Sequence, residues 1–309
     1  MEYSPALSSG NGKRTIRKTI SAVILAAGYS SRMGHFKPLS ILGSTTAVQR
    51  CVNLFKSAGI YDIRVIVGYR HSEITESLSG TGVRTVLNEQ FQDGMFSSVK
   101  SGLLSFDEFP EAFFMLPVDI PLVRTSSVHE ILRNLEGCSA DVIFPCFLGK
   151  RGHPPLIKGE LIPEILKFEG DGGLRGYLNK KTALNAELPD ENILRDMDIP
   201  EQYRNMMERL TYYNIPSKEE CVAFLKHQLK AKENLIKKAE LTAEVALRLY
   251  EVERKNNSAL RPKLITALAL LYEAFVDCRS RDLLTTDLSA KFGDSELTQL
   301  LKEVSNAPD

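Results

Sequence analysis

Small and basic residues suited to holding a phosphate chain gather in the segment 28–38. Gly28 is followed by Tyr29-Ser30-Ser31, and Arg32 and Lys37 come next. Glycine and serine leave backbone N–H groups open to phosphate oxygens, and the two cations add positive charge opposite a triphosphate. The segment lacks both the GK[ST] ending of a Walker loop and the GxGxxG of a dinucleotide site. These residues predict a nucleoside triphosphate loop of another kind.

Asp119 is the second residue placed to do chemistry. It follows the apolar run 113–118, and Pro121 comes two residues later. If that run is a central strand, Asp119 lies at the edge where open α/β sheets bind ligands. The other interpretation is an aspartate that caps the next helix, which Pro121 makes less natural.

The elements that must position these residues alternate along the chain. Buried strands that alternate with helices along the sequence predict an α/β fold with an open, mostly parallel sheet and helices on both faces. Strand-like apolar runs lie at 22–27, 63–67, 83–87, 113–118 and 140–147. Helical spacing covers 45–58 and 71–78, and the segment 88–103 reads as a loop that enters a third helix.

Residues 25–38 read L-A-A-G, then three other residues, R-M-G, two other residues and K-P. This pattern resembles the signature loop of nucleotidyltransferases with a Rossmann-like fold. Among these it is most similar to the molybdenum cofactor cytidylyltransferases, and the likeness covers 20–207 in five ordered motifs. The resemblance implies Mg²⁺-dependent transfer of a nucleotidyl group from a triphosphate to a phosphorylated acceptor, with release of pyrophosphate. Two alternatives remain: a nucleotidyltransferase acting on a sugar phosphate or another small phosphate, and a non-catalytic nucleotide-binding regulator.

The resemblance also implies roles for particular residues. Arg32, Lys37 and Asp119 are the expected catalytic residues. The expected Mg²⁺ ligands are Asp119 and Asp198, with Asp196 as an accessory carboxylate. The expected nucleotide-binding residues are Leu25, Ala26, Ala27, Gly28, Ser30, Ser31, Arg32, Lys37, Asn88, Gly94, Ser97 and Ser98.

The acceptor side has its own motifs by the same resemblance. Arg151 and His153 stand in R-G-H-P, and Arg175 stands in G-D-G-G-L-R; all three are expected to face the acceptor. For the serines at 97–98 the other interpretation is a simple helix cap, and for His153 it is a loop histidine without a role. Relatives that transfer cytidylyl groups carry alanine at the place of Ala27, which favours CTP. The expected acceptor is molybdopterin, and the expected protein partner is a molybdoenzyme or its chaperone.

Composition excludes some partners. The 39 basic and 39 acidic residues cancel, which argues against a nucleic-acid binder that depends on bulk charge. No apolar run approaches the length of a membrane span, and five scattered cysteines suggest reduced thiols in a cytoplasmic protein. Residues 1–19 read as a disordered basic tail rather than a signal peptide.

The last hundred residues change character. Residues 20–210 form the expected nucleotidyltransferase domain, 212–217 a linker, and 218–309 a helical domain with helices near 221–229, 235–250 and 264–276. This domain resembles metal-dependent HD phosphohydrolases, but Lys238, Tyr272 and Glu273 stand where that family has metal ligands. A degenerate HD domain and an unrelated helical bundle are both consistent with this pattern. A chain ending near Leu210 is expected to keep transfer activity if the helices cover no apolar face.

Overall fold

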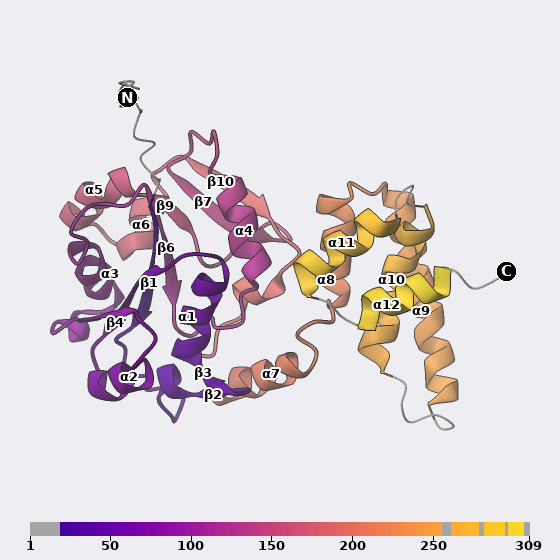
Figure 1. Ribbon diagram of the computed structural model, residues 1–309, viewed down its shortest axis with the longest axis horizontal. Helices are drawn as coiled ribbons and strands as arrows, with labels where there is room; N and C mark the ends of the chain where they lie inside the picture. The colour runs from indigo at the N-terminus through magenta and orange to yellow at the C-terminus, as the bar shows by residue number, and fades with distance from the viewer. Residues whose placement is uncertain (1–18, 255–260, 278–280, 294–295, 306–309) are drawn as a thin grey trace, which may run out of the picture.

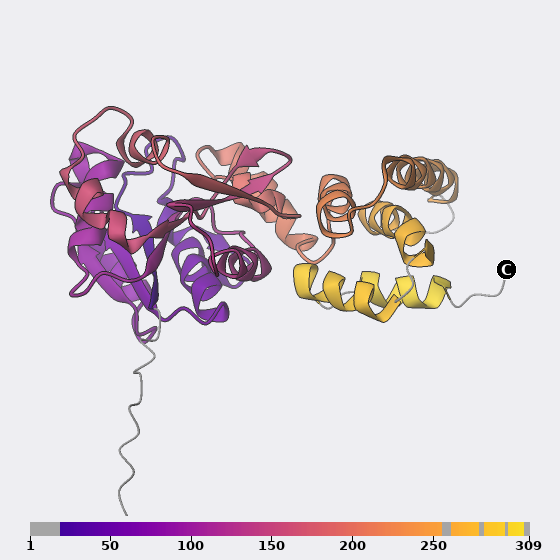
Figure 2. The same cartoon turned by 90° about the horizontal axis from the view of Figure 1, so that it is seen from above.

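The computed structural model describes residues 19–254, 261–277, 281–293 and 296–305. The predicted basic tail, apart from its last residue, lies outside these ranges. An α/β part and a C-terminal group of helices lie side by side, and the chain passes from one to the other through α7 (Pro200–Thr211) and α8 (Lys218–Ala223) (Figures 1 and 2).

The α/β part is built on one mixed, mostly parallel sheet, which confirms the predicted fold class. Its strand order is β10-β7-β9-β6-β1-β4-β5, with β8 paired to β7. The strands are β1 (Ile20–Ala26), β4 (Asp62–Val67), β5 (Arg84–Leu87), β6 (Ala112–Pro117), β7 (Val142–Phe147), β8 (Lys150–Arg151), β9 (Leu156–Lys158) and β10 (Ala183–Glu187). The five predicted strands are present within two residues. The structure adds β8, β9 and β10, and β9 runs antiparallel to both β6 and β7.

Strand β1 is the centre of the sheet because it is parallel to β4 on one side and to β6 on the other. Its alternate residues point to opposite faces, as the pleat requires. Ala22 and Ile24 join one apolar cluster, and Val23 and Leu25 join another. Because both faces are buried, β1 appears in the sequence as an unbroken apolar run rather than as an alternating one.

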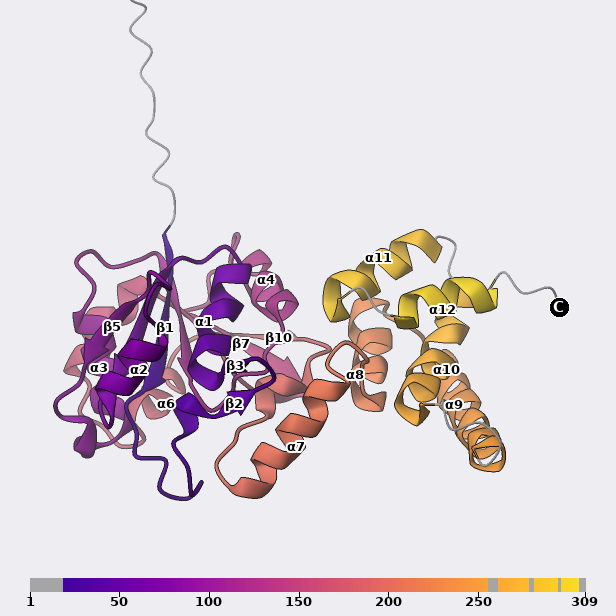
Figure 3. The same ribbon diagram turned by 60° about the horizontal axis from the view of Figure 1, so that its bottom comes forward.

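Helices cover both faces of the sheet. On the face of Ala22 and Ile24 lie α1 (Ala47–Ser57), α2 (His71–Ser77) and α4 (Thr125–Arg133). On the other face lie α3 (Met95–Leu104), α5 (Ile162–Lys167) and α6 (Gly173–Leu178). A small hairpin of β2 (Ile41–Leu42) and β3 (Thr45–Thr46) follows the phosphate loop. It contacts α7, since the Tyr203 hydroxyl donates to the Ile41 carbonyl at 2.7 Å (Figure 3).

The C-terminal region is helical, as predicted. Helix α8 continues as a π-helical turn, η5 (Phe224–Gln228), and is followed by α9 (Glu233–Glu253), α10 (Pro262–Asp277), α11 (Arg281–Phe292) and α12 (Glu296–Ser305). These helices enclose their own apolar cluster, which includes Phe224, Leu271 and Phe275. Helices α11 and α12 were not predicted from the sequence. Across the described ranges, no helix has both the length and the apolar character needed to cross a membrane.

Lys238 and Glu273 are two of the residues that the resemblance to HD phosphohydrolases places at metal-ligand positions. In the structure the Lys238 ammonium forms an ion pair with Glu273 Oε2 at 2.7 Å, and Thr242 Oγ1 donates to Glu273 Oε1 at 3.0 Å. A carboxylate engaged in this way is held by a cation of the protein itself. Within the part of the chain that the structure describes, no group of three or more His, Cys, Asp or Glu residues is arranged to hold a metal ion.

Candidate active site

The phosphate loop and Asp119 meet because the strands that precede them are neighbours. Strands β1 and β6 are parallel and in register, with Leu25 beside Pro117, and Val118 N donates to Leu25 O at 3.0 Å. Both chains therefore leave the sheet at the same edge. In open α/β sheets this carboxyl-end edge is the ligand-binding edge.

A pocket of about 340 Å³ opens at this edge. It brings together most of the residues expected to bind the nucleotide, and both expected metal ligands. Those present are Leu25, Ala26, Ala27, Gly28, Ser30, Arg32, Lys37, Gly94, Ser98, Asp119 and Asp198. Ser31, Asn88 and Ser97 do not line it. The sequence interpretation missed further lining residues, which are Tyr29, Pro38, Phe91, Gln92, Met95, Pro117 and Val118.

The loop after β1 is held in shape by its own polar groups. Ser30 has a left-handed backbone, with φ of 60°, and its Oγ accepts from Lys37 N at 3.1 Å. Met33 N also donates to Ser30 O at 3.1 Å. Over Gly28 an added Cβ would meet no protein atom within 4 Å. The backbone at Gly28 is therefore open to a ligand, as the phosphate-loop interpretation requires.

Lys37 lies between two carboxylates. Its ammonium donates a hydrogen bond to Asp198 Oδ1 and forms an ion pair with Asp119 Oδ2 at 3.4 Å. Arg32 reaches the other oxygen of Asp198, with Nη2 to Oδ2 at 2.6 Å. The side chains of Lys37, Asp119 and Asp198 are 12%, 20% and 26% exposed, whereas that of Arg32 is 70% exposed. The site thus contains two partly buried carboxylates, one enclosed cation and one cation open to solvent.

The two carboxylates differ in proton affinity. Burial raises the pKa of Asp119 above its usual value; Lys37 opposes this shift and Asp198 adds to it. The hydrogen bond from Lys37 holds the pKa of Asp198 below its usual value. Ionised oxygens of this kind suit a hard cation, since Mg²⁺ is commonly bound by one or two carboxylates together with substrate phosphates. Asp119 and Asp198 are therefore a donor set that fits Mg²⁺.

Asp196 does not line this pocket. Its Oδ1 accepts from Gln202 Nε2 at 2.6 Å, and Gln202 Oε1 in turn accepts from Asp198 N at 2.6 Å. Gln202 therefore fixes the backbone at Asp198 at the start of α7. Gln202 is not among the residues expected at the site, and its place in the sequence gives no sign of this contact.

We expect Asp198→Ala to lower kcat/KM for transfer on the order of 10²-fold, because it removes a carboxylate whose two oxygens contact Lys37 and Arg32. Asp196→Ala is expected to cost less than about tenfold, because Asp196 acts through Gln202. Steady-state kinetics of the two purified variants tests the assignment. A larger loss in the Asp196 variant would reverse the roles of the two carboxylates.

Asn88 holds the first turn of α3 through side-chain hydrogen bonds. It is 3% exposed, and its Nδ2 donates to Ser97 Oγ at 2.9 Å and to Ser98 Oγ at 3.0 Å. The N-cap of α3 is Gly94, with φ of 95°, and no side chain caps the helix. The interpretation of these serines as helix caps is therefore wrong. Ser98 lines the pocket, whereas Asn88 and Ser97 hold Ser98 and the preceding turn in place.

The three residues expected at the acceptor do not share one pocket. Arg151 lies on β8, where its guanidinium stacks on Phe144 at 4.3 Å and its Nε donates to Asn185 Oδ1 at 2.8 Å. Arg175 is exposed on α6, which packs against α3. His153 is largely enclosed; burial lowers the pKa of its imidazole, and its Nδ1 has no hydrogen-bond partner. The charge of Asp196 opposes this fall in the pKa of His153.

Comparison with known proteins agrees with this geometry. A family model described as the MobA-like NTP transferase domain matches residues 22–186. The molybdenum cofactor cytidylyltransferase of Escherichia coli K12 is 27% identical over 197 residues, which are 62% of this chain and 97% of that protein. A nucleotidyl transferase from Methanothermobacter has a TM-score of 0.55 at 23% identity, covering 62% of this chain and 98% of that one.

A Mycobacterium tuberculosis protein crystallised with manganese has the same fold, with a TM-score of 0.53 at 19% identity over 62% of this chain and 98% of that one. The family match extends from β1 into β10. It therefore includes the phosphate loop, Asp119 and the other residues that line the pocket, except Asp198, which lies beyond its end. The chain belongs to the MobA-like NTP transferase domain family and is a nucleotidyltransferase.

Proposed function

We propose that this protein transfers a cytidylyl group from CTP to the terminal phosphate of a phosphorylated acceptor, with molybdopterin as the first candidate. An acceptor phosphate oxygen forms the new bond to the α-phosphorus, the bond from the α-phosphorus to the β-phosphate oxygen breaks, and pyrophosphate leaves. The phosphate nucleophile is already ionised at neutral pH, so no general base is needed. The observation that carries the proposal is Lys37 between Asp119 and Asp198, facing the open loop at Gly28.

The protein's part in this reaction is to position the substrates and to balance charge. The amides of the 28–31 loop, with Lys37 and Arg32, would hold the triphosphate. Asp119 and Asp198 would hold Mg²⁺, which supplies stabilisation of the charge that develops on the phosphates. Arg32 would stay in contact with the pyrophosphate as it leaves, because its guanidinium is largely in solvent while one nitrogen is paired with Asp198.

The base preference is proposed to follow the packing at Ala27. Ala27 is 4% exposed, and both Ala27 and Phe91 lie close to Gly68: a Cβ added at Gly68 would stand 2.9 Å from the Ala27 Cβ and 2.7 Å from Phe91 Cγ. This side of the pocket is therefore closely filled. Removing the methyl group of Ala27 would open space beside Phe91, where a larger base could enter.

We expect CTP to be used better than GTP by about tenfold or more in kcat/KM, as one closely packed methyl group can provide. Ala27→Gly is expected to narrow this preference only partly, because Gly94 and Ser98 also line the pocket. Competition assays with both nucleotides at equal concentration measure the ratio. Equal use of CTP and GTP by the unmodified protein would contradict the cytidylyl assignment.

The acceptor is identified by measuring pyrophosphate release. The protein is incubated with each nucleoside triphosphate in turn, with Mg²⁺ or Mn²⁺, and with molybdopterin, a hexose 1-phosphate or no acceptor. Mn²⁺ is included because the mycobacterial protein of the same fold was crystallised with manganese. Release with CTP and molybdopterin supports the proposal. Release only with the hexose 1-phosphate would move the enzyme to sugar-phosphate activation, and tight CTP binding without release would indicate a regulator.

A further inference from the structure

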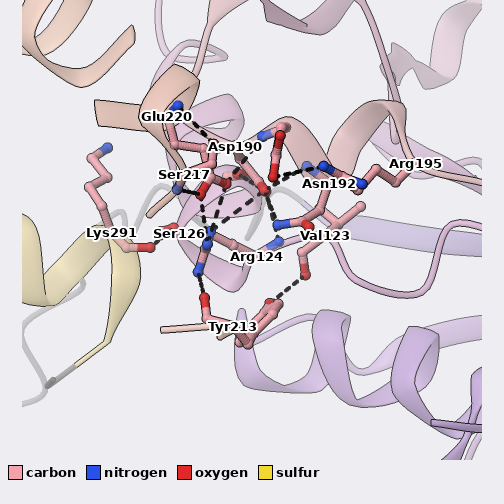
Figure 4. A network of polar contacts seen from close by, with 12 residues as sticks. Val123, Arg124, Ser126, Asp190, Asn192, Arg195, Tyr213, Ser217, Glu220 and Lys291 are labelled. Carbon is pink, nitrogen blue, oxygen red and sulfur yellow. Dashed lines mark hydrogen bonds and ion pairs between the residues drawn. The ribbon is translucent and has the colours of Figure 1, made fainter. Parts of the chain in front are cut away.

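Glu220 lies on α8 in the helical region, and its side chain is wholly buried, at 0% exposure. Its carboxylate accepts hydrogen bonds from Arg124 Nη2 at 3.2 Å, from Arg209 Nη2 at 2.8 Å and from Ser217 N at 3.0 Å. Glu191 N also donates to it, at 3.3 Å. Three of these donors come from the nucleotidyltransferase part: the chain after β6, the 3-10 turn η4 (Glu191–Leu194) and α7 (Figure 4).

Arg124 is the main partner of Glu220, and the helical region encloses it. Its guanidinium lies 5.0 Å from the Phe292 ring of α11 and 4.8 Å from the Tyr213 ring, and its Nη1 donates to Tyr213 O at 2.7 Å. Burial lowers the pKa of Arg124, but Glu220 and Asp190 outweigh that effect and raise it overall. The guanidinium is therefore charged and depends on these two carboxylates.

Asp190 connects this cluster with the segment that ends at Asp198. One oxygen of Asp190 accepts from Arg124 N at 2.9 Å and from Ser127 Oγ at 2.7 Å. At the other end of the segment, Met197 N donates to Asp119 O at 3.0 Å. The segments 119–124 and 190–198 are therefore linked twice, once beside the site carboxylates and once at the buried charge cluster.

Glu220 belongs to neither segment, but it bonds to both of them at the buried charge cluster. It accepts from the Arg124 side chain on one segment and from the Glu191 backbone on the other. Around the cluster, Ser126 Oγ donates to Lys291 O at 2.9 Å, and the Lys291 ammonium forms an ion pair with Glu130 at 2.5 Å. These contacts tie α4 to α11, so the helical region is attached to the nucleotidyltransferase part at a second place.

We propose that Glu220 is a positioning residue of the transferase site: it holds together the two segments that carry Asp119 and Asp198, and so makes the helical region part of the active-site scaffold. The inference rests on the proposed function only for the assignment of these two aspartates as metal ligands. Glu220 touches neither the pocket nor the reacting atoms. Its effect must reach the site through the spacing of the two carboxylates.

The sharpest test uses the full-length protein with Glu220→Gln, which keeps the shape of the side chain and removes its charge. Mn²⁺ affinity is measured by electron paramagnetic resonance in the presence of an α,β-methylene analogue of CTP, which cannot react. We expect the Mn²⁺ Kd to rise by about tenfold, as when a residue supporting metal ligands is lost. Metal-free binding of the analogue is expected to be unchanged, because the loop and Lys37 do not contact the cluster.

Glu219→Gln is the matched control, since Glu219 is the exposed neighbour on the same helix, and it is expected to leave the Mn²⁺ Kd unchanged. Glu220→Asp, which keeps the charge on a shorter side chain, is expected to give a smaller rise. A lower melting temperature with an unchanged Mn²⁺ Kd would overturn the inference, because Glu220 would then be purely structural. Absence of pyrophosphate release from the unmodified protein would instead refute the proposed function and leave this binding test intact.

Discussion

Replacing Asp119 with alanine is expected to lower kcat/KM for nucleotidyl transfer on the order of 10³-fold or more. Asp119 follows the central strand β6 and is only 20% exposed, and it contributes one of two carboxylates beside Lys37. Without it, a divalent cation would keep a single protein carboxylate at this edge, and Lys37 would pair with Asp198 alone. Initial rates of pyrophosphate release at CTP concentrations well below KM, with saturating acceptor, measure the loss.

The matched control is Asp107→Ala, which removes a carboxylate that is 88% exposed and forms an ion pair with Arg84. That variant is expected to keep full activity. Near-normal turnover in the Asp119 variant would show that the metal is held elsewhere.

Replacing Asp119 is expected to lower activity without lowering the thermal stability of the protein. The fold raises the pKa of Asp119, chiefly through burial, so it favours the protonated carboxyl. The stability this provides is present at low pH and is lost as the pH rises through the raised pKa. At neutral pH the ionised group therefore destabilises the fold. Asp119→Asn, which mimics the neutral form, is expected to have a melting temperature at pH 7 no lower than that of the unmodified protein. A clearly lower value would mean that Lys37 stabilises the ionised form more than burial disfavours it.

Lys37→Met is expected to lower kcat/KM for transfer on the order of 10²-fold to 10³-fold, because it removes the enclosed cation that faces the triphosphate. The same change frees two carboxylates from a competing ammonium. Free of nucleotide, the variant is therefore expected to bind Mn²⁺ more tightly than the unmodified protein, while its KM for CTP rises. Tighter Mn²⁺ binding together with a higher KM for CTP distinguishes loss of Lys37 from general damage to the site.

Titration with Mn²⁺ and steady-state kinetics on the same preparation supply both values for the Lys37 variant. Lys167→Met is the control, since Lys167 is exposed on α5, on the face of the sheet opposite α1. It is expected to change neither value. Weaker Mn²⁺ binding in the Lys37→Met variant would mean that Lys37 does not compete for the carboxylate oxygens.

The parts of the site that lie close in sequence could be predicted. Residues 20–37 contain strand β1, the turn at Gly28 and the cations Arg32 and Lys37. A strand that is buried on both faces can be recognised in the sequence by its continuous apolar run. Asp119 was predictable for the same reason. That these two stretches meet follows from general rules, because parallel neighbouring strands end at the same edge.

The placement of Arg151 and Gln202 could not be predicted in this way. Arg151 is in the expected motif, yet β8 turns it onto Phe144 and Asn185. Gln202 was not among the expected site residues, yet its side-chain amide hydrogen-bonds to both Asp196 Oδ1 and Asp198 N. A motif specifies residue types in order, whereas the direction of each side chain depends on strand pairing and on helix geometry.

The sequence by itself determined the α/β fold, the phosphate loop, the place of Asp119 and the change to helices near residue 210. It also predicted that a chain ending near Leu210 would keep transfer activity if the helices cover no apolar face, and this stays a prediction. Such a chain would lack Glu220, so Arg124 and Arg209 would each lose a carboxylate partner that they have in the intact protein. Only the tertiary structure brings these charges together. Arg124 and Glu220 are 96 positions apart, and local apolar periodicity carries no record of which distant charges the packed core will enclose together.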